Sequence, residues 1–375
     1  MKIHKLEYKD HEYQWELAPI EFSPNLNLLV GISGVGKTQI LRAINQLKKI
    51  TNGSSLNGVE WNIKFSTKDG SNYDWSGKFE TKKNNQLFDD EDDGESNVGL
   101  LYEELHCNTR QIIQRTQEKI IFNDNKTPKL SPYQSLIKIL EEEDIIVPVK
   151  EGFDKIFFTD VESAVDRVWR LPVSLVKKYE NSNFKTLKDS DLPALIKLSL
   201  VNKLFPTNFA TIKEIFIEIF PTVEDIRIES LSLNELPIAI PDANIVTIKE
   251  KQVSSWIRNI SSGMLKTLMY ISQIYLSPDD GVILIDEFEN SLGVNCMDSV
   301  TDLITEQNNL QFILTSHHPY IINNISPMYW KIITREGGLV SGKDSEYFHI
   351  PKSRHKAFLK LLKILEKEVD KNVES

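Results

Sequence analysis

The feature that most constrains the fold of this chain is a glycine-rich segment, residues 31–38, with the sequence Gly-Ile-Ser-Gly-Val-Gly-Lys-Thr. An apolar run at residues 26–30 precedes it, and a helix-like stretch at residues 39–44 follows it. Strand, glycine loop and helix in this order are typical of a phosphate-binding loop. Glycines let backbone N–H groups face phosphate oxygens, and the start of the helix adds partial positive charge. The sequence therefore predicts a nucleotide site here, and a chance glycine turn is the weaker alternative.

Within this loop we expect bound nucleotide to contact seven residues: Ser33, Gly34, Val35, Gly36, Lys37, Thr38 and Gln39. Lys37 would supply positive charge to the β- and γ-phosphates. The Thr38 hydroxyl would be a ligand for Mg²⁺. The loop therefore predicts a nucleotide bound together with Mg²⁺.

A second segment, residues 281–287, is a short apolar run that ends in Asp286 and Glu287. Its Ile and Val content predicts a fully buried parallel strand. Ligands of open α/β sheets bind at the carboxyl ends of such strands, so both acids are expected at the nucleotide. Asp286 would lie on the Mg²⁺ side, and Glu287 would orient or deprotonate the attacking water. Solvated acids at the end of a strand are the alternative.

A third segment, Ser261, Ser262 and Gly263, precedes apolar residues at helical spacing. A helix start with free N–H groups and a hydroxyl can bind an anion. A second anion-binding start makes sense if it serves the nucleotide of a partner molecule. Taken alone, the segment is also an ordinary serine N-cap.

The fourth segment, residues 310–319, is an apolar strand followed by His317 and His318. A histidine at the end of a central strand can hydrogen-bond a γ-phosphate or the attacking water. Two adjacent histidines also raise the alternative of a metal site. Neighbouring positions on a strand point in opposite directions, so this pair is not expected to converge on one ion.

These four segments, in this order, resemble the ABC-type ATPase heads of the SMC, RecF and overcoming-lysogenisation group, which is AAA_15- or AAA_21-like. The matching parts are residues 31–38, 260–264, 283–287 and 290–292, the last of which resembles a D-loop, and His317 as a switch histidine. The usual signature is Leu-Ser-Gly-Gly-Gln, and this chain has Ile-Ser-Ser-Gly-Met.

The resemblance implies an α/β fold, a P-loop NTPase with an ABC-ATPase head. Such a head has a central, mostly parallel sheet plus an antiparallel sheet, and here it carries an inserted compact helical subdomain. ATP and Mg²⁺ are the implied cofactors, and ATP hydrolysis is the implied reaction.

The expected organisation follows from the positions of these motifs. The predicted parts are residues 1–155 and 223–350 for the head, 156–222 for the helical insertion and 351–375 for an amphipathic C-terminal helix. The insertion lacks the sustained heptads of an SMC arm, so a compact helical subdomain is expected. Strands are predicted at residues 59–65 and 73–79 as a hairpin, and at 223–228, 245–248, 330–334 and 347–350.

Two further segments carry weaker predictions. Gln134 is the candidate Q-loop residue, which would coordinate Mg²⁺ or water. The acidic run at residues 89–95 predicts a solvated, mobile loop, with calcium binding as a second interpretation.

Composition favours an intracellular, cytoplasmic protein. Two isolated cysteines, Cys107 and Cys296, are too few for a disulfide framework or a zinc site. The N-terminal residues do not resemble a signal peptide, and no apolar run reaches the ~20 residues of a membrane span. A net charge of −10 argues against nucleic-acid binding by the whole surface, although a local basic groove remains compatible with it.

Three functions fit these observations. The first is an ATPase that dimerises around ATP, or forms a higher even-numbered oligomer, and controls a separate effector such as a nuclease. Anti-phage defence ATPases of the Septu type are similar in this way. The second is a RecF-like clamp on duplex DNA, with Lys177, Lys178, Lys185 and Lys188 as candidate contacts. The third is a slow nucleotide-switched scaffold, which Glu287 disfavours because a pure switch needs no water-activating acid.

Overall fold

The computed structural model describes residues 1–82, 98–159, 167–231 and 241–374. The acidic run at residues 89–95 lies outside these described residues. Two compact units make up the chain. The first combines Met1–Phe158, Asp280–Asp286 and Asn309–Ser375, and the second combines Thr159–Asp279 and Glu287–Asn308. The four parts predicted from the sequence, with boundaries near residues 155, 222 and 350, stay a prediction about folding units.

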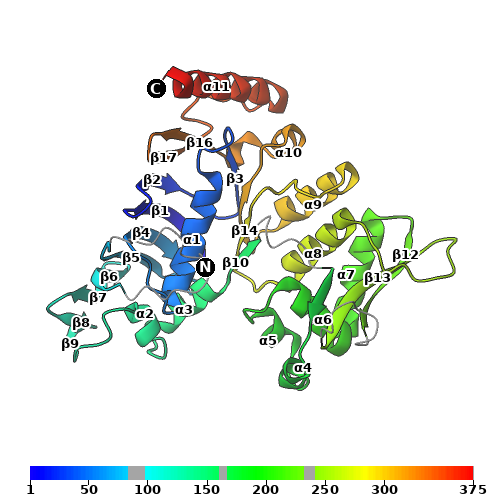
Figure 1. The fold of residues 1–375 in the computed structure, drawn as a ribbon, viewed down its shortest axis with the longest axis horizontal. Coiled ribbons are helices and arrows are strands. Elements are labelled where there is room, and N and C mark those ends of the chain that lie inside the picture. Colours follow the sequence, from blue (N-terminus) through cyan, green and yellow to red (C-terminus); the bar gives the residue numbers. More distant parts are fainter. Residues whose placement is uncertain (83–97, 160–166, 232–240, 375) are drawn as a thin grey trace. The chain divides into compact units, whose positions relative to one another are not determined.

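The first unit is organised around one 14-stranded sheet (Figure 1). Its centre consists of the parallel strands β14 (Val282–Ile285), β15 (Gln311–Thr315), β3 (Leu26–Val30) and β16 (Trp330–Glu336). Every residue of β3, β14 and β15 is buried, as expected for strands covered on both faces. The predicted buried strand before Asp286 is therefore confirmed. The short strand β10 (Ile156–Thr159) forms the edge of the sheet beside β14.

The parallel centre continues directly into an antiparallel arm, so both predicted sheet types belong to one sheet. β17 (Leu339–Asp344) forms a hairpin with β16 and pairs in parallel with β2 (Trp15–Glu21). The remaining strands are antiparallel neighbours in the order β2, β1 (Lys2–Asp10), β4 (Val59–Ser66), β5 (Asn72–Phe79), β6 (Leu100–Cys107), β7 (Arg110–Thr116), β8 (Ile120–Phe122) and β9 (Asn125–Lys126). The predicted hairpin of residues 59–65 and 73–79 is confirmed as β4 and β5.

Helix α1 (Lys37–Thr51) packs its apolar side into the core of the first unit, together with α2 (Leu136–Ile139) and α3 (Val147–Asp154). Alternation along β4 buries Trp61 and Phe65, which meet Trp75 of β5 and Phe153 of α3 in an aromatic cluster. Offset and edge-to-face ring contacts of this kind add to the stabilisation from buried area. This core holds α1, and therefore the loop that precedes it, in a fixed position on the sheet.

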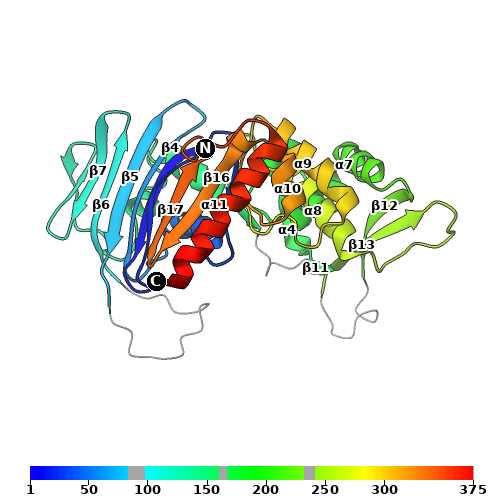
Figure 2. The ribbon, with the colours of Figure 1, turned by 90° about the horizontal axis from the view of Figure 1, so that it is seen from above.

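The C-terminal part of the first unit contains α10 (Pro319–Asn324), the 3₁₀ turn η2 (Pro327–Tyr329) and α11 (Arg354–Glu374). α11 contacts α10 and buries Ala357 and Leu361, which confirms the predicted amphipathic helix (Figure 2). The strand predicted at residues 347–350 is wrong, because this segment forms turns. The chain instead pairs β17 with β16 directly across the Gly337 turn, so the hairpin ends before Tyr347.

The second unit combines helices with a separate three-stranded sheet. Its elements are α4 (Val173–Tyr179), α5 (Phe184–Lys188), α6 (Ala194–Leu204), α7 (Pro206–Ile219), α8 (Ser262–Leu276), α9 (Val294–Glu306), β11 (Val168–Arg170), β12 (Val223–Ser230) and β13 (Ala243–Glu250). Helices α4 to α7 lie in the segment predicted to be helical, while its extent as an inserted subdomain stays a prediction. Proline lies at the starts of α4, α6 and α7, where a missing backbone N–H costs nothing.

One expectation for this unit is wrong. Within the predicted helical insertion, Val168 and Trp169 belong to β11 and not to a helix, because they pair with Ile245 and Asn244 of β13. The strands predicted at residues 223–228 and 245–248 are confirmed as parts of β12 and β13, which form the sheet β11-β13-β12 with β11. A helical spacing of apolar residues over so short a segment cannot distinguish a helix from a strand whose partner lies far along the chain.

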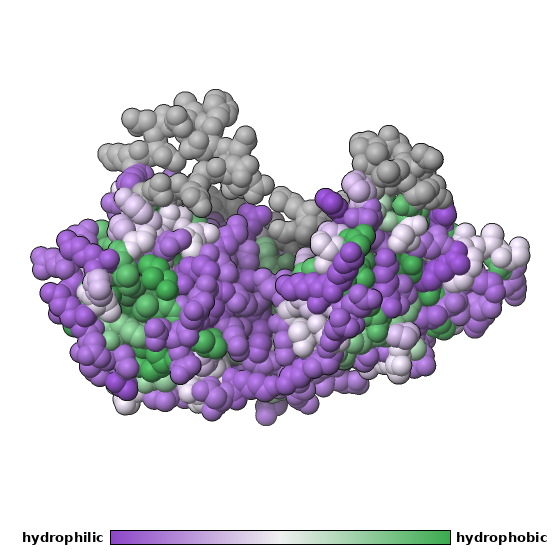
Figure 3. Space-filling view, turned by 90° about the horizontal axis from the view of Figure 1, so that it is seen from below, coloured by the Kyte–Doolittle hydropathy of each residue, from purple (hydrophilic) through white to green (hydrophobic). Residues whose placement is uncertain are grey.

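Among the described residues, no helix is both long enough and apolar enough to cross a membrane. Cys107 and Cys296 are free thiols, as their isolation in the sequence predicted. On the face of the first unit shown at the left of Figure 3, hydrophobic residues form an area that hydrophilic residues border.

Candidate nucleotide site

The glycine loop joins the buried strand β3 to the start of α1, which confirms the predicted strand–loop–helix order. Gly34 and Gly36 have left-handed φ angles of 83° and 99°, and Gly36 is the N-cap of α1. A Cβ added at Gly36 would lie 2.8 Å from Gln39 Oε1 and 2.9 Å from the Val340 side chain. Glycine is therefore required at this position both by the backbone angle and by the close packing.

Lys37 is the first residue of α1, and its ammonium lies directly under the loop. Its Nζ donates to the carbonyl oxygens of Gly31, at 2.9 Å, and Ile32, at 3.0 Å. These are neutral acceptors, and charge-assisted hydrogen bonds to phosphate oxygens are roughly twice as strong. The positive charge is thus already held inside the loop, where an anionic ligand can take over its hydrogen bonds.

The buried carboxylate of Asp286 lies beside the loop at the end of β14. The Thr38 hydroxyl donates to Asp286 Oδ1 at 3.1 Å, and the Thr315 hydroxyl of β15 donates to the same oxygen at 2.5 Å. Asp286 is only 5% exposed, so these hydrogen bonds are what a buried carboxylate requires. Two residues 248 positions apart in the sequence, Thr38 and Asp286, are therefore brought into direct contact.

The residues at this point fit a Mg²⁺–nucleotide. Thr38 and Asp286 present a hydroxyl and a carboxylate, which are oxygen donors of the kind that Mg²⁺ takes. The buried Oε1 of Gln39, next to Thr38, has no hydrogen-bond partner, and an orphaned polar oxygen is costly unless a ligand or water satisfies it. Mg²⁺ usually takes one or two carboxylates plus substrate phosphates. Within the described part of the chain, no group of three His, Cys, Asp or Glu residues forms a metal site independent of a nucleotide.

Glu287 follows Asp286 directly and is the first residue of its segment in the second unit. Its φ of 44° is left-handed, which is unusual for a residue with a side chain. Asn290 N donates to Glu287 O at 2.8 Å and Leu292 N donates to Glu289 O at 3.1 Å, so the D-loop-like segment is a pair of turns. Strained backbone that is held by such hydrogen bonds is typical of functional positions.

The signature-like segment forms the start of α8 within the second unit. Ser261 is the N-cap, and its Oγ accepts from Met264 N at 3.1 Å. Ser261 and Ser262 are exposed. A Cβ added at Gly263 would lie 3.0 Å from Ser291 O, so this helix start packs against the D-loop-like turn. The N-cap interpretation is thus confirmed, and the role toward a partner's nucleotide stays a prediction.

The two adjacent histidines have different surroundings. His318 is the N-cap of α10, where its Nδ1 accepts from Tyr320 N at 3.2 Å and its backbone N–H donates to Ser316 Oγ at 3.1 Å. His317 is exposed and lies two residues after Thr315, the residue that contacts Asp286. His318 therefore shapes the helix start, whereas the His317 side chain is exposed to solvent.

The role of Gln134 as a metal ligand stays a prediction, and the structure places its side chain at the opposite end of α1 from Thr38. The Gln134 side chain lies near Gly53, where an added Cβ would be 3.2 Å from its Nε2. Gly53 follows the C-terminal end of α1, whereas Thr38 is at the N-terminal end of this 15-residue helix. At 1.5 Å per residue the helix separates the two ends by roughly 20 Å. The sequence around Gln134 does not indicate which end of α1 this residue lies near, because that depends on how the segment packs in the folded protein.

Two residues near the loop had not been predicted. Thr315 holds the Asp286 carboxylate, and its signal is a hydroxyl at the end of a buried strand. Arg335 of β16 reaches the loop, with its Nη1 3.4 Å from Gly34 O and its Nε donating to Gly337 O at 2.8 Å. Nothing in the sequence around Arg335 indicates this position, since it depends on the pairing of β16 with β3.

Residues 26–323 match the family described as "AAA domain, putative AbiEii toxin, Type IV TA system". No curated protein is significantly similar in sequence.

Among solved structures, similarity is found to an SMC head bound to the C-winged helix domain of ScpA, with 15% identity, 92% and 97% of the two chains covered and a TM-score of 0.47. It is also found to an SMC head domain from Thermotoga maritima, with 12% identity, 92% and 99% covered and a TM-score of 0.46. A third is an SMC head with an extended coiled coil bound to the C-terminal domain of ScpA from Pyrococcus furiosus, with 15% identity, 98% and 99% covered and a TM-score of 0.48.

Proposed function

Because this chain belongs to the AAA_21 family of AAA-type ATPases, we propose that it binds ATP with Mg²⁺, dimerises around the nucleotide and hydrolyses it. We further propose that this cycle controls a separate effector protein.

The observation that carries the proposal is the hydrogen bond from the Thr38 hydroxyl to Asp286 Oδ1, at 3.1 Å. It joins the phosphate loop to the acid of the buried strand, which is the arrangement that P-loop NTPases use to hold Mg²⁺ beside the phosphates. The lysine ammonium under the loop and the orphaned Gln39 oxygen support the same site.

The roles of the side chains follow from their chemistry. Lys37 and the loop N–H groups would bind the phosphates, and Thr38 with Asp286 would hold Mg²⁺, which neutralises charge on the phosphates when bound. Thr315 keeps the Asp286 carboxylate in place through its hydroxyl. Glu287 would accept a proton from the attacking water, and His317 would hydrogen-bond the γ-phosphate or that water.

Dimerisation is proposed from the start of α8. Ser261, Ser262 and the first N–H groups of this helix form an exposed, uncharged anion-binding end. The first unit already contains a complete phosphate loop of its own. A second helix start of this kind is therefore proposed to contact the γ-phosphate bound by a partner molecule, so that ATP stabilises the dimer by linkage.

The effector role rests on the resemblance to Septu-type defence ATPases and on the form of the insertion. α4 to α7 are short, the longest having 14 residues, so the described part of this unit provides a compact surface and no long arm. A compact unit of this kind suits docking of a separate protein such as a nuclease, and bacterial anti-phage defence is the proposed setting.

The test is to measure ATP turnover and the mass of the protein by light scattering, with and without ATP, for the wild type and for Glu287→Gln. We expect Mg²⁺-dependent turnover in the wild type and a long-lived ATP-bound dimer in the variant. Absence of ATP binding would contradict the whole proposal. Binding without turnover in the wild type would instead favour the nucleotide-switched scaffold.

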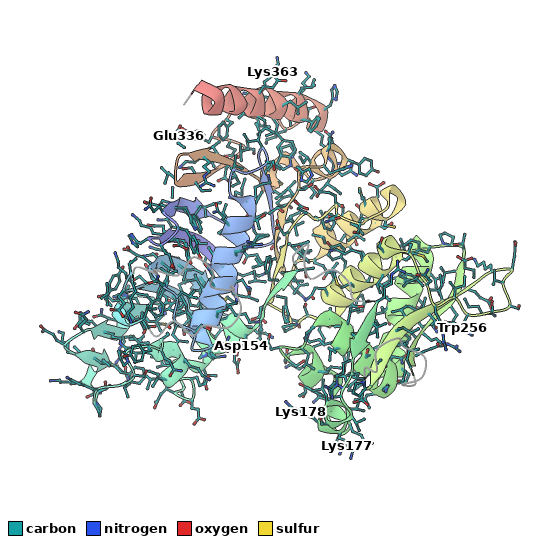
Figure 4. The ribbon with its side chains drawn as sticks, in the orientation of Figure 1. Asp154, Lys177, Lys178, Trp256, Glu336 and Lys363 are labelled. Atoms are coloured by element: carbon teal, nitrogen blue, oxygen red, sulfur yellow. The ribbon has the colours of Figure 1, made fainter. Side chains whose placement is uncertain are left out.

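The alternative of an ATP-dependent clamp on duplex DNA has one supporting observation. Lys177 and Lys178 are exposed neighbours on α4 (Figure 4). Lys188, in contrast, is paired with Asp279 at 3.4 Å. Clamp binding should require ATP and fall steeply with salt, because phosphate contacts release counterions. Fluorescence anisotropy with labelled duplex DNA and a non-hydrolysable ATP analogue tests it, and no binding at low salt removes the clamp alternative.

A further inference from the structure

A cavity of about 760 Å³ lies at the far antiparallel end of the first unit's sheet. It is formed by β6, β7, β8 and β9 and by the segment of residues 127–133 that follows β9. Strands β16, β17, β2, β1, β4 and β5 lie between this region and β3, the strand that carries the phosphate loop. The cavity is therefore separate from the nucleotide site.

The wall formed by residues 127–133 is fastened to the sheet at both ends. Thr127 N donates to Ile120 O at 3.0 Å, and Leu100 N donates to Pro132 O at 2.8 Å. The Arg115 side chain, which is 3% exposed, donates from Nη1 to Gln134 O at 2.8 Å and from Nη2 to Ser131 O. The segment thus arches over the sheet between fixed points, and the cavity is a built feature of the fold.

The lining of the cavity combines hydrophobic side chains with polar and charged ones. Leu100, Leu101, Ile120, Leu130 and Pro132 contribute hydrophobic surface. Tyr133 adds an aromatic ring that is 43% exposed. A volume between roughly 300 and 1,000 Å³ with mostly apolar walls and a few polar groups is typical of sites for small molecules.

The polar groups of the cavity carry an excess of positive charge. Lys119, Lys126 and Lys129 line it, and none of them forms an ion pair with a described residue. Of its two acids, Glu80 is already engaged, because it accepts from Gly99 N at 2.8 Å and pairs with Lys82 at 3.1 Å. Three lysines that form no ion pair with any described residue line one cavity of a chain whose net charge is −10.

We propose that this cavity binds a small organic anion with an apolar or aromatic body. The lysines would meet the anionic group, the leucine, isoleucine and proline side chains would bury the apolar body, and Tyr133 would pack against it. A bare polyphosphate or a nucleic-acid backbone fits less well, since it would leave the apolar walls uncovered. The proposal does not depend on the proposed ATPase cycle.

Two dyes with the same aromatic body test it on the full-length protein. The first is 8-anilinonaphthalene-1-sulfonate, which carries an anionic group, and the second is the neutral 1-N-phenylnaphthylamine. The test variant replaces Lys119, Lys126 and Lys129 with Ala. The matched control replaces three exposed lysines of the second unit, Lys177, Lys178 and Lys185, with Ala. Fluorescence titrations give the affinity of each dye for each protein.

We expect the lysine variant to bind the sulfonate about tenfold more weakly, since each exposed charge contact contributes up to about 1 kcal/mol. It should bind the neutral dye as the wild type does, and the control should bind both dyes normally. Tyr133→Ala should weaken the binding of both dyes.

A charge-reversal variant keeps the test decisive if the triple variant folds poorly. Glu118 lines the same cavity and is exposed, so Glu118→Lys should preserve folding and tighten sulfonate binding. Sulfonate affinity that neither falls in the lysine variant nor rises in Glu118→Lys overturns the proposal, because the dye then binds elsewhere.

Discussion

The start of α1 in the first unit and the start of α8 in the second are both helix N-termini that follow or contain glycine, yet they are built differently. At α1, the loop contains a lysine whose ammonium donates to two carbonyls, and a buried carboxylate contacts Thr38. At α8, the groups are two exposed serines, Ser261 and Ser262. We therefore propose that the first site binds phosphate and metal by itself, and that the second only adds to an anion that is already held.

The glycines of the two sites show the same difference. Gly36 is needed because its φ is 99° and a Cβ would meet the Val340 side chain and Gln39. Gly263 sits close to backbone, with Ser291 O only 3.0 Å from where its Cβ would be. The loop glycine therefore shapes a ligand site, and the α8 glycine allows the helix start and the D-loop-like turn to touch. The following experiments test this difference between the start of α1 and the start of α8.

The largest effect is expected for Lys37→Ala, which removes the ammonium group that lies under the phosphate loop. Two or more charge-assisted hydrogen bonds are lost, so ATP affinity should fall by about 10³-fold and turnover with it. Isothermal titration calorimetry measures the affinity. Lys49→Ala, an exposed lysine in the last turn of the same helix, is the control and should bind ATP normally. Normal affinity in Lys37→Ala would remove the phosphate-loop assignment.

Next in size is Glu287→Gln. An amide cannot accept the proton of water, so turnover should fall by about 10²-fold while ATP affinity changes little. A phosphate-release assay and a binding titration separate the two quantities. Glu306→Gln, an exposed acid at the end of α9, should keep full turnover. If Glu287→Gln turns over ATP at the wild-type rate, the general base is another residue.

The second site is tested by Ser262→Asp. An acidic residue in the first turn of a helix is favourable for the helix itself, so α8 should keep its stability. Its charge would oppose a partner's phosphate, so turnover and ATP-dependent dimerisation should fall by about five- to tenfold with monomer affinity for ATP unchanged. Light scattering and turnover assays measure both effects.

Ser262→Ala, which carries no charge, is the matched control for this experiment. It should dimerise nearly as the wild type does. Gly263 is less suitable as a test position, because any side chain there also disturbs Ser291. Wild-type turnover in Ser262→Asp would mean that the start of α8 is only a capped helix end.

The smallest effect is expected for Thr315→Val. This change keeps the shape of the side chain and removes the hydroxyl that donates to Asp286 Oδ1 at 2.5 Å. The loss of this one hydrogen bond costs about 1 kcal/mol, so the Mg²⁺ concentration needed for half-maximal turnover should rise by roughly fivefold. Thr315→Ser keeps the hydroxyl and should stay close to the wild type. An unchanged Mg²⁺ requirement in Thr315→Val would show that Asp286 needs no support from β15.

The features that could be predicted from the sequence alone are short, contiguous segments. Residues 31–38 predicted the loop, and the apolar run before Asp286 predicted a buried strand, because both signals arise from neighbours in the chain and from local backbone geometry. The start of α8 was predicted for the same reason, since a serine N-cap bonds its own helix.

Only the tertiary structure decided which distant segments meet. Thr315 and Arg335 lie beside Asp286 and the glycine loop because β15 and β16 flank β3, while the Gln134 segment packs at the other end of α1. Trp169 was misassigned, since its strand partner Asn244 lies far along the chain. Strand pairing and helix packing depend on the apolar surface area that the whole core buries. A short local pattern of residues does not contain this information.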